Sequence, residues 1–299
     1  MSAHAPSMGT VWMEAARPRT LPAAVAPVIA ASALAWQDGV FVAPAAVACL
    51  LFALLVQIGT NFANDYFDFV KGADTAERVG PRRAVAAGLV APATMRRATI
   101  WVFALAFLVG LTLLPYGGWR LLVIGLLSIA CGVLYTGGPF PLAYHGLGDV
   151  FVFVFFGLVA VGATYFVQAG TVSVDAWLIG SAMGALSTAI LVVNNYRDIA
   201  TDRKAGKRTL AVRLGPRWTQ VQFALLHLLT VAVIAGLAWR GRLVPLEALG
   251  LGLVALGIGA WQTRALVRAK NPAALICLLG QTGRYLAGFA VGLGLALVF

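Results

Sequence analysis

The stretch from Val42 to Asp68, VAPAAVACLLFALLVQIGTNFANDYFD, decides the fold of this chain. Its part from 42 to 63 is almost entirely apolar, and a helix needs about 20 such residues to cross the hydrocarbon core of a bilayer. The stretch then ends in amides and carboxylates, with Asn64, Asp65 and Asp68 within five residues. Polar and acidic groups in this position predict a membrane helix that carries a functional site at its end.

The composition of the whole chain also indicates a membrane protein. Of its 299 residues, 61% are hydrophobic and only 11% are charged, whereas soluble domains have roughly 25% charged residues. The net charge of +11 does not indicate nucleic-acid binding, because the Lys and Arg residues lie in short gaps between apolar runs. This arrangement is typical of membrane topology and of anionic ligands at a membrane surface, so we expect a lipid bilayer and no nucleic acid as partners.

Nine apolar runs approach the length of a membrane span. We therefore predict an all-α integral membrane protein with about nine transmembrane helices and a single domain, 1–299. The runs lie at about 20–37, 42–63, 97–115, 119–137, 147–169, 172–196, 218–239, 243–264 and 279–298. Pro22 and Pro27 are expected to kink the first of them.

Lys and Arg are unevenly divided between the two sides that nine spans define. The N-terminal arm and the gaps after the second, fourth, sixth and eighth runs hold 19 of the 22 basic residues. The other side has only Arg120, Arg240 and Arg242. Because an excess of Lys and Arg marks cytoplasmic loops, we expect the N-terminus and the long basic gaps to lie in the cytoplasm.

The polar ending of the second run recurs at the end of the sixth. Residues 194–202 read NNYRDIATD and, like residues 61–68, are followed by a basic gap. The recurrence four spans apart suggests an internal duplication, spans 1–4 and 5–8. Both motifs should then meet on the same side of the membrane.

The spacing within these motifs predicts a metal site. On a helix, Asn64 and Asp68 stand at i and i+4 and share a face, and residues 194, 198 and 202 form a similar row. Rows of carboxylates near lipid repel one another unless a cation offsets them. Oxygen ligands without His or Cys favour Mg²⁺ or Ca²⁺ over zinc. The predicted metal ligands are Asn64, Asp65, Asp68, Asn194, Asp198 and Asp202, of which Asp68, Asp198 and Asp202 are the predicted catalytic residues.

Basic residues beside both motifs predict a phosphate ligand. Six of the eleven acids of the chain fall in the two motif regions, and Lys and Arg surround them. Guanidinium and ammonium groups can bind the phosphate oxygens that a metal leaves uncovered, so the pattern suits a diphosphate whose tail lies in the bilayer. The predicted diphosphate-binding residues are Lys71, Arg78, Arg82, Arg83, Lys204, Lys207 and Arg208.

The motifs N-D-x-x-D at 64–68 and D-x-x-x-D-x-x-x-G at 198–206 resemble the two aspartate-rich motifs of the UbiA superfamily of intramembrane prenyltransferases. The resemblance extends over essentially the whole chain. It implies a helical bundle around a central cavity, transfer of a polyprenyl group from polyprenyl diphosphate, and Mg²⁺, with two ions expected and Mn²⁺ as an alternative. One position departs from the pattern: many members carry another Asp four residues after Asp68, where this chain has Gly72 and then Asp74.

Three stretches, 64–74, 78–83 and 135–149, resemble the menaquinone branch of that superfamily, the 1,4-dihydroxy-2-naphthoate polyprenyltransferases. This resemblance implies 1,4-dihydroxy-2-naphthoate as acceptor, loss of CO₂, a demethylmenaquinone as product and a place in the bacterial cytoplasmic membrane. Two alternatives stay open at this point. One is the same transfer to another aromatic acceptor, such as 4-hydroxybenzoate, and the other is a membrane transporter.

The stretch 135–149, YTGGPFPLAYHGLGD, is too rich in Gly and Pro for a regular helix. We predict a cytoplasmic loop between the fourth and fifth spans that caps the cavity. The aromatic run that begins at Phe151 either stabilises an allylic cation or packs against helices and lipid. The predicted acceptor-binding residues are Tyr135, Tyr144, His145 and Tyr196.

Overall fold

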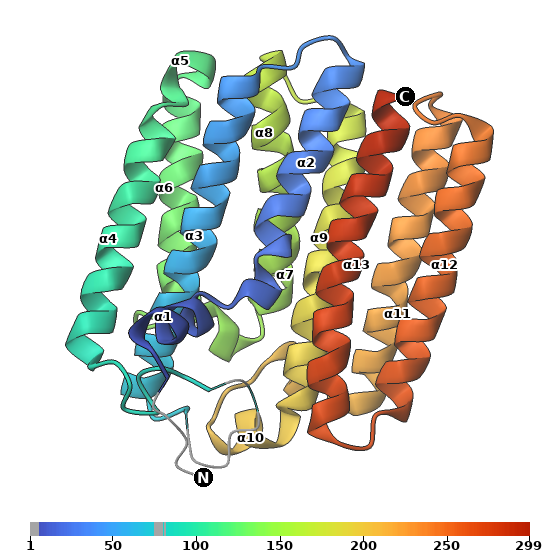
Figure 1. Ribbon diagram of the computed structural model, residues 1–299. Coiled ribbons are helices and arrows are strands. Elements are labelled where there is room, and N and C mark those ends of the chain that lie inside the picture. The colour runs from blue at the N-terminus through green and yellow to red at the C-terminus, as the bar shows by residue number, and fades with distance from the viewer. Residues whose placement is uncertain (1–5, 75–79, 81) are drawn as a thin grey trace.

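The computed structural model describes residues 6–74, 80 and 82–299, and these form a bundle of helices (Figure 1). In chain order the elements are α1 (Met8–Ala16), the 3₁₀ turn η1 (Pro18–Thr20), α2 (Pro22–Gln37), α3 (Ala43–Val70), α4 (Pro92–Leu111), α5 (Leu114–Gly117), α6 (Trp119–Leu134), the 3₁₀ turn η2 (Leu142–His145), α7 (Gly148–Phe153), the π-helical turn η3 (Val154–Val159), α8 (Ala160–Ala169), α9 (Val174–Arg197), α10 (Ile199–Lys204), α11 (Leu210–Trp239), α12 (Pro245–Arg268) and α13 (Pro272–Val298). The predicted all-α class is confirmed.

Each predicted apolar run corresponds to a helix. In the part of the chain described, seven helices are long and apolar enough to cross a membrane: α3, α4, the continuous run α7–η3–α8, α9, α11, α12 and α13. The first run is an eighth span only if α2 is taken together with α1 and η1, from which a 52° bend separates it. The fourth run is the 16-residue α6, a shorter apolar helix. About nine spans is therefore an approximate count.

The bend in the first span lies just before Pro22, the first residue of α2, and Pro27 lies inside that helix. Arg17, directly after α1, has φ 54° and ψ 70°, which is the left-handed conformation. The chain therefore turns between α1 and α2, and α1 lies across the lower end of the bundle in Figure 1.

Helix α9 is the most buried of the spans, and its side chains form the main hydrophobic core with those of α2, α11 and α13. It also packs closely against η3. A Cβ atom on Gly157 would lie 2.4 Å from the Gly180 carbonyl oxygen, and one on Gly184 would lie 2.6 Å from the Phe153 carbonyl oxygen. Only glycine permits this backbone approach, which is common between membrane helices. The contact fixes the position of the aromatic residues on α7 and η3.

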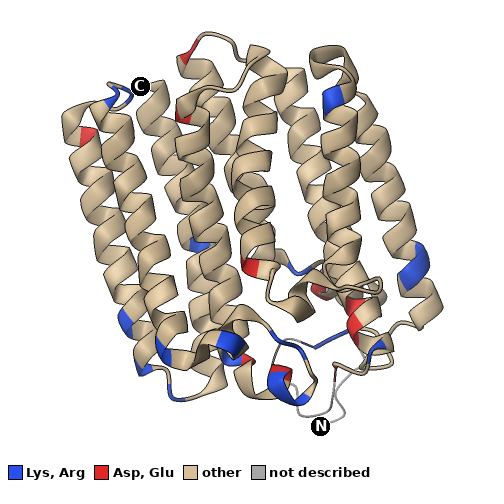
Figure 2. Ribbon diagram, turned by 180° about the vertical axis from the view of Figure 1, so that it is seen from behind, with Lys and Arg blue, Asp and Glu red and all other residues tan. Residues whose placement is uncertain are grey.

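The charged residues gather at the two ends of the bundle (Figure 2). Most of the Lys and Arg residues lie at the end where the chain begins, as the sequence predicts. Here this is called the motif end, because both acidic motifs lie there. The opposite end, called the far end, carries Asp38, Asp175, Arg240 and Arg242 in one hydrogen-bonded group.

Candidate active site

The first motif lies on the last two turns of α3, which continues beyond the apolar run to Val70. The Asp68 carboxylate accepts hydrogen bonds from Arg83 Nη2 and from the Tyr144 hydroxyl, both at 2.9 Å. Asn64 Oδ1 accepts a hydrogen bond from the Thr136 hydroxyl at 2.8 Å. The helical spacing predicted for Asn64 and Asp68 is thus confirmed, and both side chains are buried.

Asp65 is buried as well but points to a different neighbour. Its two carboxylate oxygens accept hydrogen bonds from the backbone N–H groups of Ala84 and Val85, at 2.9 and 3.2 Å. Asp65 does not line the cavity described below. Its contacts hold the segment that begins directly after Arg83.

The structure gives a reason for Gly72, which stands where many members of the superfamily carry an Asp. Helix α3 ends at Val70, and Gly72 has φ +68°, the left-handed conformation that favours glycine after a helix. The chain turns back there and brings Asp74 Oδ1 to 3.5 Å from Arg83 Nε. Asp74 therefore joins the same buried group as Asp68, although it lies on a turn and not on the helix.

The second motif is divided between two helices. Helix α9 ends at Arg197 and α10 begins at Ile199, with Asp198 between them at φ −97° and ψ 7°. The predicted row of residues 194, 198 and 202 is thus not on one continuous helix. Asp202 lies on α10, after the break.

Arg197 joins the two polar groups of this motif. It donates from Nε and Nη2 to the two oxygens of Asp198, at 2.7 and 2.6 Å, and from Nη2 to Asn194 Oδ1 at 2.9 Å. The Arg197 side chain is only 1% exposed, and planar guanidinium groups suit two-point binding of a carboxylate. In the sequence, Arg197 is one of the 19 basic residues of the arm and gaps, and the local pattern does not predict this contact.

Tyr144 connects the two motif regions. Besides its bond to Asp68, its ring lies 5.2 Å from Lys71 Nζ and 5.4 Å from Lys207 Nζ, measured to the ring centroid. Its carbonyl oxygen accepts a hydrogen bond from the Arg208 N–H at 3.0 Å. Burial, and then the negative charge of Asp68, raise the pKa of the Tyr144 hydroxyl, so it stays protonated and can keep donating to that carboxylate.

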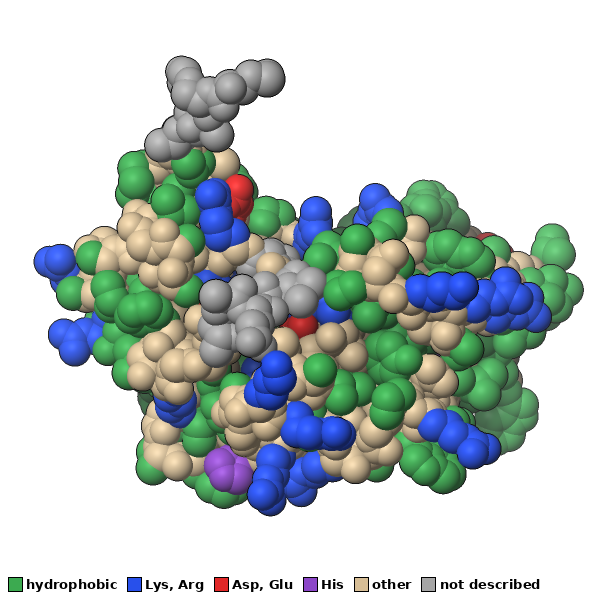
Figure 3. All heavy atoms as spheres, turned by 90° about the horizontal axis from the view of Figure 1, so that it is seen from below, with side chains coloured by type: hydrophobic (Ala, Val, Ile, Leu, Met, Phe, Trp, Pro, Cys, Tyr) green, Lys and Arg blue, Asp and Glu red, His purple; other side chains and the backbone are tan. Residues whose placement is uncertain are grey.

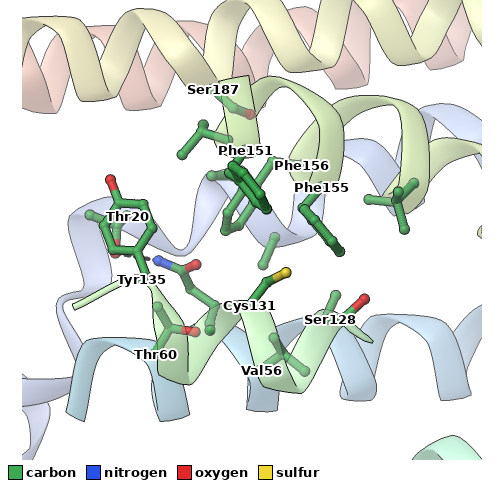
Figure 4. Close-up of a pocket in the computed structure, with 18 of the residues that line it drawn as sticks. Thr20, Val56, Thr60, Ser128, Cys131, Tyr135, Phe151, Phe155, Phe156 and Ser187 are labelled. Atoms are coloured by element: carbon green, nitrogen blue, oxygen red, sulfur yellow. Dashed lines mark hydrogen bonds between the residues drawn. The ribbon is translucent and has the colours of Figure 1, made fainter. Parts of the chain in front are cut away.

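A cavity of about 290 Å³ lies between α2, α3, α6, α7, α8 and α9. Toward the motif end its wall includes Asn64, Asp68, Arg83, Asn194 and Lys207. Away from the motifs the wall is mainly apolar, and it includes Cys49, Phe52, Leu113, Leu121 and Ile124. Figure 4 shows the middle of the cavity, where Phe151, Phe155 and Phe156 lie opposite Ser128 and Cys131.

The predicted basic residues take different places. Arg83 and Lys207 line the cavity, while Lys71 Nζ donates to the Thr136 carbonyl oxygen at 2.7 Å and to that of Gly138 at 3.3 Å. Burial lowers the pKa of Lys71, and Asp68 partly opposes this effect. Viewed from below, the motif end shows Lys and Arg side chains in several groups scattered across its surface (Figure 3).

Of the other four predicted basic residues, three lie away from the cavity and one is outside the residues that the structure describes. Arg82 pairs with Glu14 of α1 at 2.8 Å, and both side chains are largely exposed. Lys204 and Arg208 are also exposed. Arg78 lies outside the described residues.

Of the predicted acceptor-binding residues, the structure brings only Tyr135 to the cavity wall. The His145 ring stacks on Phe140, with centroids 3.6 Å apart. The Tyr196 hydroxyl accepts a hydrogen bond from Gln220 of α11 at 2.9 Å, and Tyr196 does not line the cavity. The predicted loop 135–149 is confirmed as irregular backbone with the short turn η2 over 135–147, whereas its last two residues already belong to α7.

Known proteins resemble the chain in both sequence and fold. A model of the UbiA prenyltransferase family matches residues 24–296. The chain is 39% identical over 279 residues to the 1,4-dihydroxy-2-naphthoate octaprenyltransferase of Escherichia coli (strain K12), with 91% of this chain and 89% of that protein covered. It is 40% identical over 280 residues to the protein of the same name from Mycobacterium tuberculosis, with 91% and 95% covered. A solved UbiA homolog from Archaeoglobus fulgidus, bound to GPP and Mg²⁺, has a TM-score of 0.67 at 15% identity over 96% of this chain and 99% of that one. The chain belongs to the UbiA prenyltransferase family.

Proposed function

We propose that this chain transfers a polyprenyl group from polyprenyl diphosphate to 1,4-dihydroxy-2-naphthoate in menaquinone biosynthesis. Diphosphate and CO₂ leave, and the product is demethylmenaquinone in its reduced, quinol form. The names of the relatives at about 40% identity support this acceptor.

The single observation that carries the proposal is the two-part cavity. Its charged part offers Asp68, Arg83 and Lys207, and its remaining part is lined mainly by aliphatic and aromatic side chains. A polyprenyl diphosphate has the same division, with a charged head and a long apolar tail. A small polar solute has no apolar tail that would occupy the aliphatic and aromatic part of the cavity.

The motif residues fit a magnesium ion. Asn64, Asp68 and Asn194 line the cavity and have side-chain oxygen atoms, and Arg197 binds both Asn194 and Asp198. No three His, Cys, Asp or Glu side chains among the described residues gather closely enough to hold a metal by themselves. Mg²⁺ commonly takes a few protein oxygens and completes its shell with water and phosphate oxygens, and we expect two ions shared with the diphosphate. When bound, Mg²⁺ supplies positive charge that stabilises the leaving diphosphate.

The chain's own residues bind the diphosphate, neutralise its charge and shield the allylic cation from water. Arg83 and Lys207 lie where they can bind diphosphate oxygens as the allylic C–O bond breaks and its electron pair leaves with the diphosphate. Phe151, Phe155 and Phe156 present aromatic surface to the cavity, which stabilises an allylic cation and keeps water from it (Figure 4). The electron-rich naphthoate ring then forms the new C–C bond and loses its carboxylate as CO₂.

We place the motif end on the cytoplasmic side of a bacterial cytoplasmic membrane, together with the N-terminus. The division of Lys and Arg supports this orientation. The diphosphate and the naphthoate then reach the cavity from the cytoplasm, and the polyprenyl tail remains in lipid. Accessibility of single cysteines, introduced at Arg82 and at Trp239, to a membrane-impermeant thiol reagent would test the orientation.

The test of the function is an acceptor panel with the purified protein, a polyprenyl diphosphate, Mg²⁺ and mass detection of the products. We expect prenylation of 1,4-dihydroxy-2-naphthoate with release of CO₂ and none without a divalent metal. Prenylation of 4-hydroxybenzoate and not of dihydroxynaphthoate would overturn the acceptor assignment. Absence of turnover with every aromatic acceptor would overturn the transferase function.

A further inference from the structure

Asp149 is a buried acid on the cavity wall that belongs to neither motif. It is the second residue of α7 and is 5% exposed. Gln222 Nε2, from α11, donates to its Oδ1 at 3.0 Å. Its Oδ2 is also buried and has no hydrogen-bond donor within the part of the chain that the structure describes. A buried carboxylate oxygen without a donor is costly, so the site is built for a donor that the described residues do not supply.

The wall near Asp149 suits a flat aromatic ring. A Cβ atom on Gly148 would lie 3.0 Å from the Tyr135 hydroxyl oxygen, so that hydroxyl packs against the backbone directly before Asp149. Figure 4 shows the rings of Tyr135 and Phe151 at the cavity, together with Ser187 of α9. The Ser187 hydroxyl is likewise buried without a hydrogen-bond partner among the described residues. Aromatic faces and unmatched polar atoms thus lie on the same wall.

The chemistry of the reactants identifies the missing donor. A polyprenyl tail has no hydrogen-bond donor, and an ionised diphosphate has only acceptors. Of the reactants in the proposed function, only the dihydroxylated ring carries O–H groups that can donate to a carboxylate.

We propose that Asp149 Oδ2 accepts a hydrogen bond from one ring hydroxyl of the aromatic acceptor. Gln222 holds the carboxylate in place through Oδ1, so Asp149 both orients the ring and increases electron density on its oxygen. The inference rests on the proposed function for the identity of the acceptor. It assigns Asp149 to acceptor recognition and leaves the diphosphate to the two motifs.

The test compares Asp149→Asn with the wild type on three acceptors: 1,4-dihydroxy-2-naphthoate and its two monomethyl ethers. Asn keeps the shape, but with its oxygen bonded to Gln222 it presents an NH₂ donor to the cavity. Since a hydrogen bond to a charged group is worth about 10- to 100-fold, we expect the wild type to discriminate against one ether by that factor. Asp149→Asn should lower kcat/KM for the dihydroxy acceptor by a similar factor and lose that discrimination.

The matched control is Glu247→Gln. Glu247 is also a carboxylate with one buried, unpartnered oxygen among the described residues, but it lies on α12 and away from the cavity. It should keep the wild-type acceptor pattern. Thermal stabilisation by polyprenyl diphosphate with Mg²⁺ reports whether Asp149→Asn is folded. If it is not, Gln222→Met, which keeps the carboxylate, should show a smaller loss with the same dependence on one hydroxyl.

Several results would overturn the assignment. These are an equal loss on all three acceptors, no loss on any, a raised KM for the polyprenyl diphosphate, or a changed Mg²⁺ requirement. A wild type that prenylates a different hydroxylated acceptor would refute the proposed function instead. The same comparison, made with that acceptor and its methyl ether, would then decide the role of Asp149 independently.

Discussion

The two ends of the bundle both carry buried carboxylates paired with arginines, but only one of them opens on the cavity. At the far end, Asp175 accepts hydrogen bonds from Arg240 and Arg242, and Arg242 also donates to Asp38 at 2.6 Å. None of these residues lines the cavity. At the motif end, Asp68 and Arg83 form an ion pair of similar length, 2.9 Å, and both line the cavity.

The comparison of the two ends shows that ion pairs of similar geometry can serve either the stability of the fold or the function of a site. The far-end group connects α2, α9 and the loop after α11, and Tyr165 of α8 adds a hydrogen bond to Asp38 at 2.5 Å. Each carboxylate oxygen there has a partner from another element, which stabilises the packing of helix ends. At the motif end the same kind of pair faces a cavity, so a metal ion and a diphosphate can compete for its members.

The largest effect should come from removing a motif carboxylate. Asp68→Asn and Asp198→Asn keep the size of each side chain but remove the charge that offsets a cation. We expect kcat to fall by at least about 100-fold for each, which is the scale of losing one electrostatic contact to a transition state. Rates are measured with the purified proteins at saturating substrates. Membrane insertion should stay near the wild type, but the thermal midpoint should fall, because Arg83 and Arg197 are buried and lose a carboxylate partner. The rates are therefore taken per folded molecule, and a variant with full turnover would remove that residue from the ligand set.

Asp175→Asn should show the opposite result at the far end. It leaves Arg240 without its carboxylate and Arg242 with Asp38 alone, but these arginine side chains are 38% and 27% exposed and can turn to water. We therefore expect a loss of about 1–3 kcal/mol in stability, below the 3–5 kcal/mol of a fully buried pair. Thermal unfolding in detergent measures the loss. Turnover per folded molecule should be unchanged, and a large fall in kcat would contradict the division between the two ends.

The two ends also show how much of the fold and of the site can be predicted from the sequence. Apolar length predicts the helices, because a membrane requires about 20 apolar residues per span, and charge division predicts that both motifs share one end. The local spacing of Asn64 and Asp68 follows from helix geometry. Three contacts do not follow from local pattern: Tyr144 with Asp68, Arg197 with Asp198, and Asp65 with the backbone after Arg83. Each depends on a loop conformation or a break in a helix, which side-chain periodicity does not report.

A smaller effect on kcat is expected when a tyrosine hydroxyl is removed, and each end of the bundle offers one matched tyrosine for this test. Tyr144 and Tyr165 both donate a hydroxyl hydrogen bond to a carboxylate, to Asp68 and Asp38. Tyr144→Phe leaves the Asp68 charge and the ring contacts with Lys71 and Lys207 but removes the hydroxyl hydrogen bond to Asp68, so we expect kcat to fall about tenfold, the value of one charge-assisted hydrogen bond. Tyr165→Phe should lower thermal stability and leave kcat within about twofold of the wild type. If both variants lost kcat equally, the hydroxyl at the motif end would have no special role.

The smallest expected effect on kcat is that of Asp65→Asn, and it distinguishes Asp65 from Asp68, three residues later on the same helix. Asp65→Asn can still accept one of the two backbone N–H groups, from Ala84 or Val85, and turns an NH₂ group toward the other. The segment after Arg83 should shift, and because that arginine lines the cavity, we expect KM for the polyprenyl diphosphate to rise several-fold with little change in kcat. Steady-state kinetics at fixed Mg²⁺ resolve the two parameters. The sequence pattern predicts Asp65 as a metal ligand, and its hydrogen bonds to the segment after Arg83 lead us to expect a positioning role instead. A fall in kcat as large as that of Asp68→Asn, with a higher Mg²⁺ requirement, would restore Asp65 to the ligand set.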